Sequence, residues 1–327
     1  MKFLNNILFF KICAVVLSVF ILMLFSYLNF SFNKYVDISK NNFYVNPGSS
    51  VTQTIKSFKE KNIIDSVLRF KILSYLHNIN PKFIQGKYEI SKNDTEYSIL
   101  QKVLNGNLFQ ESLTIIEGST FSEIVMLLKD NKNIISSIGD YEYNINIDAL
   151  SPEGLCFPDT YKFSAGITKS NFLANCVKKM EIILMKYWDL RDYSLPYKTP
   201  YEMLIMASII EKESSLVSEK PLIASVFINR LNKNMRLQAD PTVIYGIKNY
   251  KGNITKKDLQ TKNEYNTYKI HGLPKTPICS PSESSIMSAS KPANSKFLYF
   301  VSNNEGKHIF SKNYKDHVKA VNKYQKK

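Results

Sequence analysis

The chain has 327 residues, and its 43 Lys and Arg against 28 Asp and Glu give a formal net charge of +15. This length predicts two compact units or three small ones, and the 44% of hydrophobic residues excludes a wholly disordered chain. The basic balance is compatible with nucleic acid, an acidic membrane surface or an anionic polymer as partner. A general compositional bias explains the charge better, because the chain is rich in Lys, Asn and Ile and has only 11 Gly.

Common metal and nucleotide motifs are missing from the sequence. The four Cys form no C-x-x-C pair, the four His form no H-E-x-x-H pattern, and neither glycine-rich phosphate-binding pattern is present. We therefore expect no metal and no cofactor. Cys13 lies in an apolar run, so an odd number of cysteines remains for the soluble part, which excludes a fully paired set. The redox states of Cys156, Cys176 and Cys279 are left open.

An uncharged apolar segment lies near the amino terminus, between residues 12 and 33. About 20 helical residues at 1.5 Å each span the roughly 30 Å hydrocarbon core of a bilayer. A cleaved signal peptide has a shorter apolar region and ends in small residues, whereas this segment ends Ser-Tyr-Leu-Asn-Phe. We therefore predict a short cytoplasmic tail at residues 1–11 and an uncleaved transmembrane helix at residues 12–32.

Short patterns of strand, turn and helix follow the apolar segment. The predicted strands are residues 43–45, 86–90 and 113–116, and the predicted helices begin near residues 51, 95 and 121. Small units of this kind must pack against one another to bury their apolar faces. We therefore predict an α+β region at residues 41–135.

The most apolar helix is predicted in the carboxyl-terminal half. The sequence Thr199-Pro200-Tyr201-Glu202 is typical of a helix amino terminus. Residues 203–210 are nearly all apolar, which indicates a helix buried on most sides. The helix ends with the two glutamates Glu211 and Glu213. With a further helix predicted at residues 218–232, the whole chain is expected to be an α+β protein.

The carboxyl end of a buried helix is a favourable place for a general acid. Low dielectric disfavours the charged form of a carboxyl group, and so does the negative end of the helix dipole. A carboxyl group that stays protonated near neutral pH is what protonation of a glycosidic oxygen requires. At about 100° per residue, Glu211 and Glu213 point to nearly opposite faces. The pattern alone leaves both as candidates, with a solvated glutamate at a frayed helix end as the alternative for either.

Four sequence blocks carry further information when they are taken together. They are Ala207–Glu213, Ala224–Leu231, Met235–Gly246 and Tyr265–Tyr268, and the segments Glu153–Leu155 and Phe157–Tyr161 accompany them. In this order they resemble the YceG-like endolytic murein transglycosylase family, and the resemblance runs from the predicted anchor to the carboxyl terminus. The sequence departs from the family at Lys275-Thr276, where the family has Pro-Gly, and this leaves the conformation of that loop open.

The resemblance implies a reaction and a catalytic residue. It implies that Glu213 is the catalytic acid of a membrane-anchored lytic transglycosylase with a LysM-like, glycan-contacting region at residues 41–135 and a catalytic domain at residues 140–327. Such an enzyme cleaves the MurNAc-GlcNAc bond of peptidoglycan and leaves a 1,6-anhydro-MurNAc end, which would terminate or trim nascent glycan. The sugar's own C6 hydroxyl is the nucleophile, so one glutamate serves as acid and base and no second carboxylate is needed.

Polar residues in the same blocks are the candidates for substrate binding, with a purely structural hydrogen-bonding role as the alternative for each. They are Gln238, Asp240, Thr242, Tyr245, Tyr265, Asn266 and Tyr268.

The expected partners follow from the resemblance and from the predicted anchor. They are peptidoglycan glycan strands, the membrane through residues 12–32, and peptidoglycan synthases. We expect a single-pass protein of the inner (cytoplasmic) membrane with its catalytic domain outside the cytoplasm. Nucleic acid is not expected, because the lysines are dispersed and no nucleic-acid-binding pattern is present. The main alternative is a non-catalytic, membrane-anchored scaffold that binds peptidoglycan, and the position of Glu213 at a buried helix end counts against it.

Overall fold

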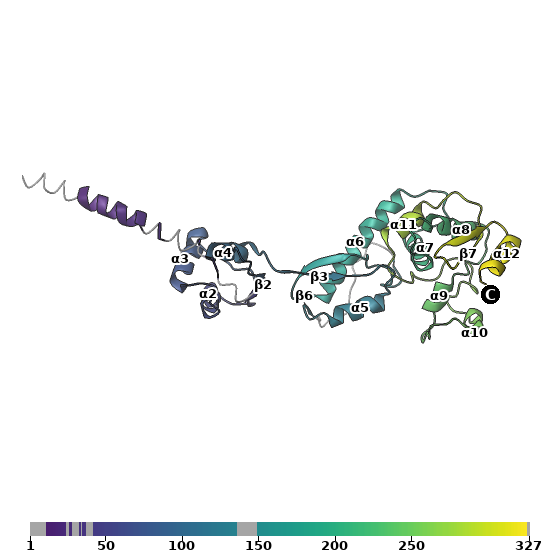
Figure 1. Cartoon of the computed structure of the whole chain (residues 1–327), viewed down its shortest axis with the longest axis horizontal. Helices are drawn as coiled ribbons and strands as arrows, with labels where there is room; N and C mark the ends of the chain where they lie inside the picture. The colour runs from purple at the N-terminus through teal and green to yellow at the C-terminus, as the bar shows by residue number, and fades with distance from the viewer. Residues whose placement is uncertain are drawn as a thin grey trace, which may run out of the picture. The chain divides into compact units, whose positions relative to one another are not determined.

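The computed structural model describes residues 11–23, 26–27, 33, 35–36, 42–135 and 149–325 (Figure 1). The chain divides into two compact units. The first covers residues 1–111 with the short stretch 164–166, and the second covers residues 112–163 and 167–327. Both helices and short strands are present, so the predicted α+β class is confirmed.

The predicted transmembrane helix is described only in part. Residues 11–23 are helical, and among the described residues no helix is both long and apolar enough to cross a membrane. Residues 24, 25 and 28–32 of the predicted span lie outside the described residues, as do residues 1–10 of the predicted tail. The transmembrane helix at residues 12–32 therefore stays a prediction.

The first unit packs three helices around a two-stranded sheet. Strand β1 (Asn42–Val45) pairs antiparallel with β2 (Gly86–Glu89), and the helices are α2 (Val51–Glu60), α3 (Val67–His77) and α4 (Glu96–Asn105). Its core is aromatic: the Phe43 ring lies 5.0 Å from that of Phe58 and 5.1 Å from that of Tyr88. The predicted strand–turn–helix pattern is thus present, but the LysM-like assignment stays a prediction.

The second unit begins with three short strand pairings and two helices. Strand β3 (Gln110–Thr114) pairs with β5 (Thr160–Ser164), and β4 (Ile134–Ile135) pairs in parallel with β6 (Ile167–Thr168). Helix α5 (Phe121–Asp130) and the long helix α6 (Lys169–Asp189) accompany them.

The boundary between the units differs from the predicted domain boundary at residues 135–140. Residues 136–148 lie outside the described residues. The buried side chains of Ile124 and Leu128 in α5 belong to the core of the second unit. The apolar face of α5 is therefore the reason that residues 112–135 pack with the second unit and not with the first.

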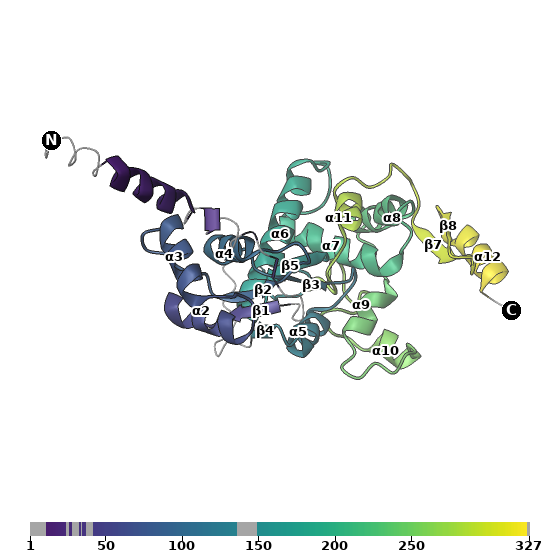
Figure 2. The ribbon, with the colours of Figure 1, turned by 60° about the vertical axis from the view of Figure 1, so that its left-hand side comes forward.

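Helix α7 (Pro200–Glu213) is central to the second unit and contacts α6, α8 (Lys220–Asn232), α9 (Asp240–Tyr245) and α11 (Glu283–Ser290), as Figure 1 and the turned view in Figure 2 allow the reader to follow. All residues from Met203 to Ile210 are buried, which confirms the predicted buried helix. The short helix α10 (Lys256–Gln260) precedes α11. The antiparallel pair β7 (Tyr299–Ser302) and β8 (His308–Ser311) and helix α12 (Tyr314–Tyr324) complete the unit, and β7 contacts α8.

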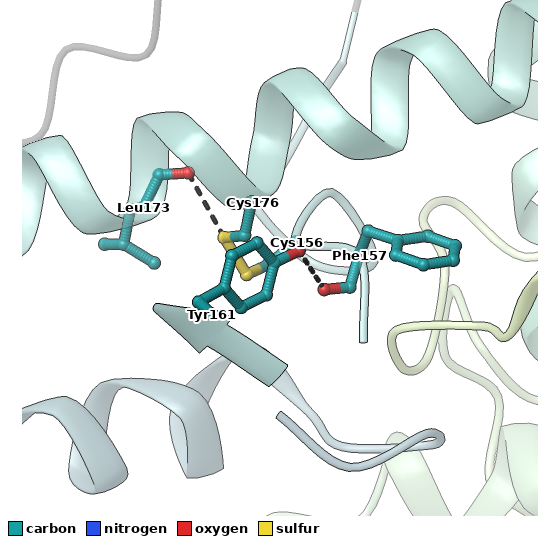
Figure 3. The surroundings of a disulfide bond; sticks show 5 residues. All are labelled: Cys156, Phe157, Tyr161, Leu173 and Cys176. Carbon is teal, nitrogen blue, oxygen red and sulfur yellow. Dashed lines mark hydrogen bonds between the residues drawn. A yellow bond between two sulfur atoms is a disulfide. The ribbon is translucent and has the colours of Figure 1, made fainter. Parts of the chain in front are cut away.

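A disulfide bond joins Cys156, in the loop before β5, to Cys176 in α6 (Figure 3). The backbone N–H of Phe157 donates to the carbonyl oxygen of Cys176 at 3.1 Å, and the Tyr161 hydroxyl donates to the carbonyl oxygen of Phe157 at 2.6 Å. Cys279 is buried as a free thiol. The odd number of cysteines excluded only a fully paired set, and the structure pairs two of the three whose redox state the sequence left open.

Removing this disulfide is expected to lower the free energy of unfolding. The two cysteines are 20 residues apart, and closing a loop of that size stabilises a folded chain by about 3 kcal/mol through the entropy of the unfolded state. Urea unfolding of the Cys156→Ala/Cys176→Ala variant measures the loss. Reductant should shift the midpoint of the wild-type chain but not that of the variant, and equal midpoints for the two oxidised proteins would contradict the prediction.

Candidate active site

The carboxyl end of α7 presents two glutamates to different surroundings. The helix starts at the N-cap Thr199, whose hydroxyl accepts from the backbone of Glu202, with Pro200 at its first position. Its apolar length fixes the rotation of the helix in the core, and Ser214 is the C-cap. Glu211 and Glu213, two residues apart, consequently point in different directions from the same buried helix end.

Glu211 is held in a network of hydrogen bonds with the start of α11. Its carboxylate accepts from the Ser282 N–H at 2.9 Å and the Ser285 hydroxyl at 2.7 Å, and it forms an ion pair with Lys220 at 3.0 Å. Burial alone would raise the pKa of Glu211, but the hydrogen bonds and the Lys220 charge outweigh it and hold the pKa below its ordinary value. Glu211 is therefore an ionised group that joins α7, α8 and α11.

Glu213 lies in the opposite electrostatic situation. Within the described part of the chain its carboxyl group forms no hydrogen bond. Burial raises the pKa of Glu213 to about 8, the negative charge of Asp240 contributes in the same direction, and the Arg230 guanidinium opposes both. The group is consequently protonated near neutral pH, as a general acid must be.

Glu213 opens into a cavity of about 510 Å³ in the second unit. One wall consists of α7 and α8, through Glu213 and Arg230. A second is the loop that leads into α9, and the third is formed by β7, β8 and α12. The cavity is open to solvent and combines aromatic and polar side chains, which is the composition that a sugar ring with its hydroxyl groups requires.

The Arg230 side chain connects two of these walls. Its Nε donates to the carbonyl oxygen of Leu298 at 2.7 Å, and its Nη1 donates to that of Leu237 at 2.6 Å. The guanidinium carbon lies 5.3 Å from the centre of the Tyr299 ring. These contacts fix a buried positive charge near the carboxyl group of Glu213.

Three of the predicted substrate-binding residues line the cavity with Glu213, namely Gln238, Asp240 and Tyr268. Gln238 has a φ of 50°, in the left-handed region that an L-residue seldom adopts. Its backbone N–H donates to the carbonyl oxygen of Thr267, which holds this turn against the neighbouring loop. The Tyr268 hydroxyl donates to Asp240 Oδ1 at 2.6 Å. The site thus carries a second carboxylate beside the general acid.

The other four predicted substrate-binding residues form internal hydrogen bonds outside the cavity lining. The buried Thr242 hydroxyl bonds to Thr267, and Asn266 donates from its amide to three carbonyl oxygens between residues 258 and 261. The Tyr245 hydroxyl donates to the buried Glu153, and Tyr265 packs against Tyr245 at 4.8 Å. The alternative of a structural role fits these contacts. No contact with a sugar is described for any of them, and their role in substrate binding stays a prediction.

Several cavity residues were not singled out from the sequence. His308 is paired through Nδ1 with Glu219 at 2.7 Å, and His317 stacks on Tyr299 with ring centres 5.0 Å apart. Arg230 fell within a family block without receiving a role. The two histidines had been weighed only as a metal pair. The signal that could have placed them is a hairpin: alternating apolar residues flank a turn that contains Gly306, and this pairs His308 with Ser302.

Fold and site together define an α+β protein with one protonated glutamate at the end of a buried helix, facing an open cavity. The YceG-like family matches residues 43–323. The chain therefore belongs to the YceG-like family, in agreement with the resemblance seen in the sequence blocks.

Similar proteins share both sequence and fold with this chain. A Bacillus subtilis (strain 168) protein named endolytic murein transglycosylase is 30% identical over 309 residues, covering 86% of this chain and 84% of its own length. A Streptococcus pneumoniae (strain D39) protein of the same name is 34% identical over 176 residues, which are 52% of this chain and 31% of that protein. The crystal structure of a YceG-like protein from Listeria monocytogenes matches 86% of this chain and 99% of its own, with 29% identity and a TM-score of 0.54.

Proposed function

We propose that this chain is a peptidoglycan lytic transglycosylase that cleaves the MurNAc-GlcNAc bond of glycan strands with Glu213 as its only acid and base. The observation that carries the proposal is the raised pKa of Glu213, to about 8, in an open cavity. The names of the Bacillus and Streptococcus relatives support the substrate class. Gln238, Asp240 and Tyr268 are the residues that we assign to orienting the sugars.

The proposed reaction has two proton transfers on one carboxyl group. Protonated Glu213 donates its proton to the glycosidic oxygen as the bond from that oxygen to C1 of the muramic residue breaks, so that the next sugar leaves as an alcohol. The resulting carboxylate accepts the proton of the muramic C6 hydroxyl while O6 forms a bond with C1. Atoms balance without water, and the product carries a 1,6-anhydro ring.

The two charges beside Glu213 suit the two states of this reaction. The negative charge of Asp240 raises the pKa of Glu213 and would stabilise the positive charge that develops at C1. The fixed Arg230 charge favours the carboxylate that remains after the first proton transfer. A balance between the two keeps the pKa close to the working pH, where a group exchanges protons in both directions most effectively.

We further propose that the catalytic unit works outside the cytoplasm, on a chain held at the inner membrane by residues 12–32, where it would meet nascent glycan and the enzymes that synthesise it. The Cys156–Cys176 disulfide supports this placement, because such bonds persist in oxidising compartments. The uncharged apolar segment supports the anchor.

The masses of the digestion products test the proposed reaction. Purified sacculi treated with the enzyme should yield fragments whose muramic ends are one water lighter than a reducing end and resist borohydride reduction. Reducing ends as the main product would overturn the proposal and would assign Asp240 the role of a second carboxylate in a hydrolase. Intact sacculi would favour the non-catalytic scaffold.

The pH dependence of cleavage is expected to follow the protonation of Glu213. Because the active form is the protonated one, kcat/KM should fall as the pH rises through about 8. Asp240→Asn removes the neighbouring negative charge, which lowers the pKa of Glu213 and moves the falling limb to lower pH. Initial rates on labelled glycan between pH 5 and 10 measure both profiles, and a limb that Asp240→Asn leaves in place would contradict this assignment of charges.

A further inference from the structure

Helix α3 of the first unit leaves one face apolar and exposed. Leu68 is 69% exposed, Ile72 41%, Tyr75 46% and Leu76 71%, and Ile79 just beyond the helix is 86% exposed. We call these five residues the α3 stripe. At about 100° per residue, the four helical members lie within roughly one quarter to one third of the circumference. Exposed apolar side chains gathered in this way mark an interaction surface.

The opposite face of α3 is held firmly in the first unit. Phe70 and Leu73 are buried in its core, and the Phe70 ring lies 6.0 Å from that of Phe58. Arg69 Nη2 donates to the buried Glu96 of α4 at 2.6 Å, and Glu96 also accepts from the Asp65 N–H. The rotation of α3 is therefore fixed, and the α3 stripe cannot turn inward without breaking these contacts.

The charge around the α3 stripe favours an anionic surface. The sequence of α3, VLRFKILSYLH, contains Arg69 and Lys71 but neither Asp nor Glu, and the exposed Lys82 follows shortly after the helix. An apolar helix face bordered by basic residues is typical of helices that lie in the interface of an anionic bilayer.

The position of α3 in the chain points to the membrane as its partner. Residues 33–41 are the nine residues between the predicted span and β1, and a fully extended segment of that length reaches about 30 Å at most. Tyr27, near the end of the predicted span, lies close enough to Arg69 for an electrostatic interaction. The first unit therefore cannot move far from the bilayer that holds the anchor.

We propose that α3 is an interfacial helix, with the α3 stripe inserted among the lipid headgroups and upper acyl chains of the membrane that holds the anchor. This rests on the membrane anchor of the proposed function but not on the cleavage reaction. The helix would then hold the first unit at the bilayer surface, instead of leaving it free at the end of a short tether.

The test places a single tryptophan on the α3 stripe of the full chain. Trp188→Phe removes the native tryptophan. Tyr75→Trp reports on the α3 stripe, and Tyr44→Trp in β1 is the matched control, because both tyrosines are 46% exposed in the same unit. The proteins are reconstituted into phosphatidylethanolamine–phosphatidylglycerol vesicles, with or without bromine at the upper part of the acyl chains. Bromine should weaken the emission of Tyr75→Trp at least about twofold, since an interfacial helix inserts about 5–10 Å, and leave that of Tyr44→Trp nearly unchanged.

A charged variant and vesicle flotation separate the possible results. Adding Leu68→Glu and Leu76→Glu to Tyr75→Trp should abolish the quenching while the protein still floats with the vesicles. Flotation with no difference between Tyr75→Trp and Tyr44→Trp overturns the proposal and leaves the anchor in place. Failure to float overturns both the anchor and the proposal. An emission shift that grows with protein density but is insensitive to bromine shows that a second copy of the chain covers the α3 stripe, which also overturns it.

Discussion

Glu213→Gln is expected to lower kcat for glycan cleavage by about 10²–10⁴-fold, at the upper end because the leaving alcohol is poor without protonation. The substitution keeps the size of the side chain and removes the proton that it transfers. Release of soluble fragments from labelled sacculi measures the loss. A variant that cleaves at a rate near that of the wild-type chain would exclude Glu213 as the acid.

The same substitution should make the folded protein more stable at neutral pH. The pKa of Glu213 is raised in the folded state, so its favourable contribution is present below the pKa of the unfolded state and is lost as the pH rises through about 8. Near pH 7 the wild-type chain must keep a proton that the unfolded chain releases, whereas glutamine has no such proton. Thermal unfolding should show a gain of about 1–3 kcal/mol at pH 7 that fades toward pH 4.5.

Glu211→Gln is the control for both measurements and should behave in the opposite way. Its cleavage rate should fall much less, because Glu211 is bonded to Ser282 and Lys220. Its stability should decrease, because the buried Lys220 loses its counter-charge. Two glutamates that are separated by one residue are thus distinguished by opposite pairs of results.

Lys220→Met is expected to lower the free energy of unfolding by about 3–5 kcal/mol, since it leaves the charge of Glu211 buried without its partner. The Lys220 side chain is 2% exposed and that of Glu211 is 7% exposed, so water screens neither group effectively. Urea unfolding monitored by the fluorescence of Trp188 measures the change.

The double variant Lys220→Met/Glu211→Gln tests the reason for this loss. It removes both charges, while the glutamine oxygen still accepts from the Ser282 N–H and the Ser285 hydroxyl. It should therefore recover most of the stability that Lys220→Met loses. A double variant that is less stable than Lys220→Met would show that the shape of the lysine side chain, and not its charge, matters at this position.

The helices and the fold class could be predicted from the sequence because their signals are local. Thr199 and Pro200 mark the start of α7, and its apolar run indicates the burial that the structure confirms. The position of the domain boundary could not be predicted in this way. The apolar face of α5 fits either unit equally well in sequence, and only its packing assigns it to the second.

The candidate site could be predicted only where its residues are close in sequence or match the family blocks. Glu213 was one of two candidates from its pattern, and the family resemblance favoured it. The different roles of Glu211 and Glu213 depend on Ser282 and Lys220, which are 71 and nine residues from Glu211. His308 and His317 lie about 100 residues from Glu213, and no spacing rule connects them with it.

The third wall of the cavity has a consequence for when this enzyme becomes active. Residues 299–325 provide that wall, more than 80 residues after Glu213 in the chain. A chain that is still being exported, with α12 not yet in place, has an acid that faces open water. Its pKa would return toward that of an ordinary glutamate, and the proton needed for cleavage would be lost at neutral pH. Emergence of the last helix is thus a built-in delay that prevents a half-translocated chain from cutting the cell wall.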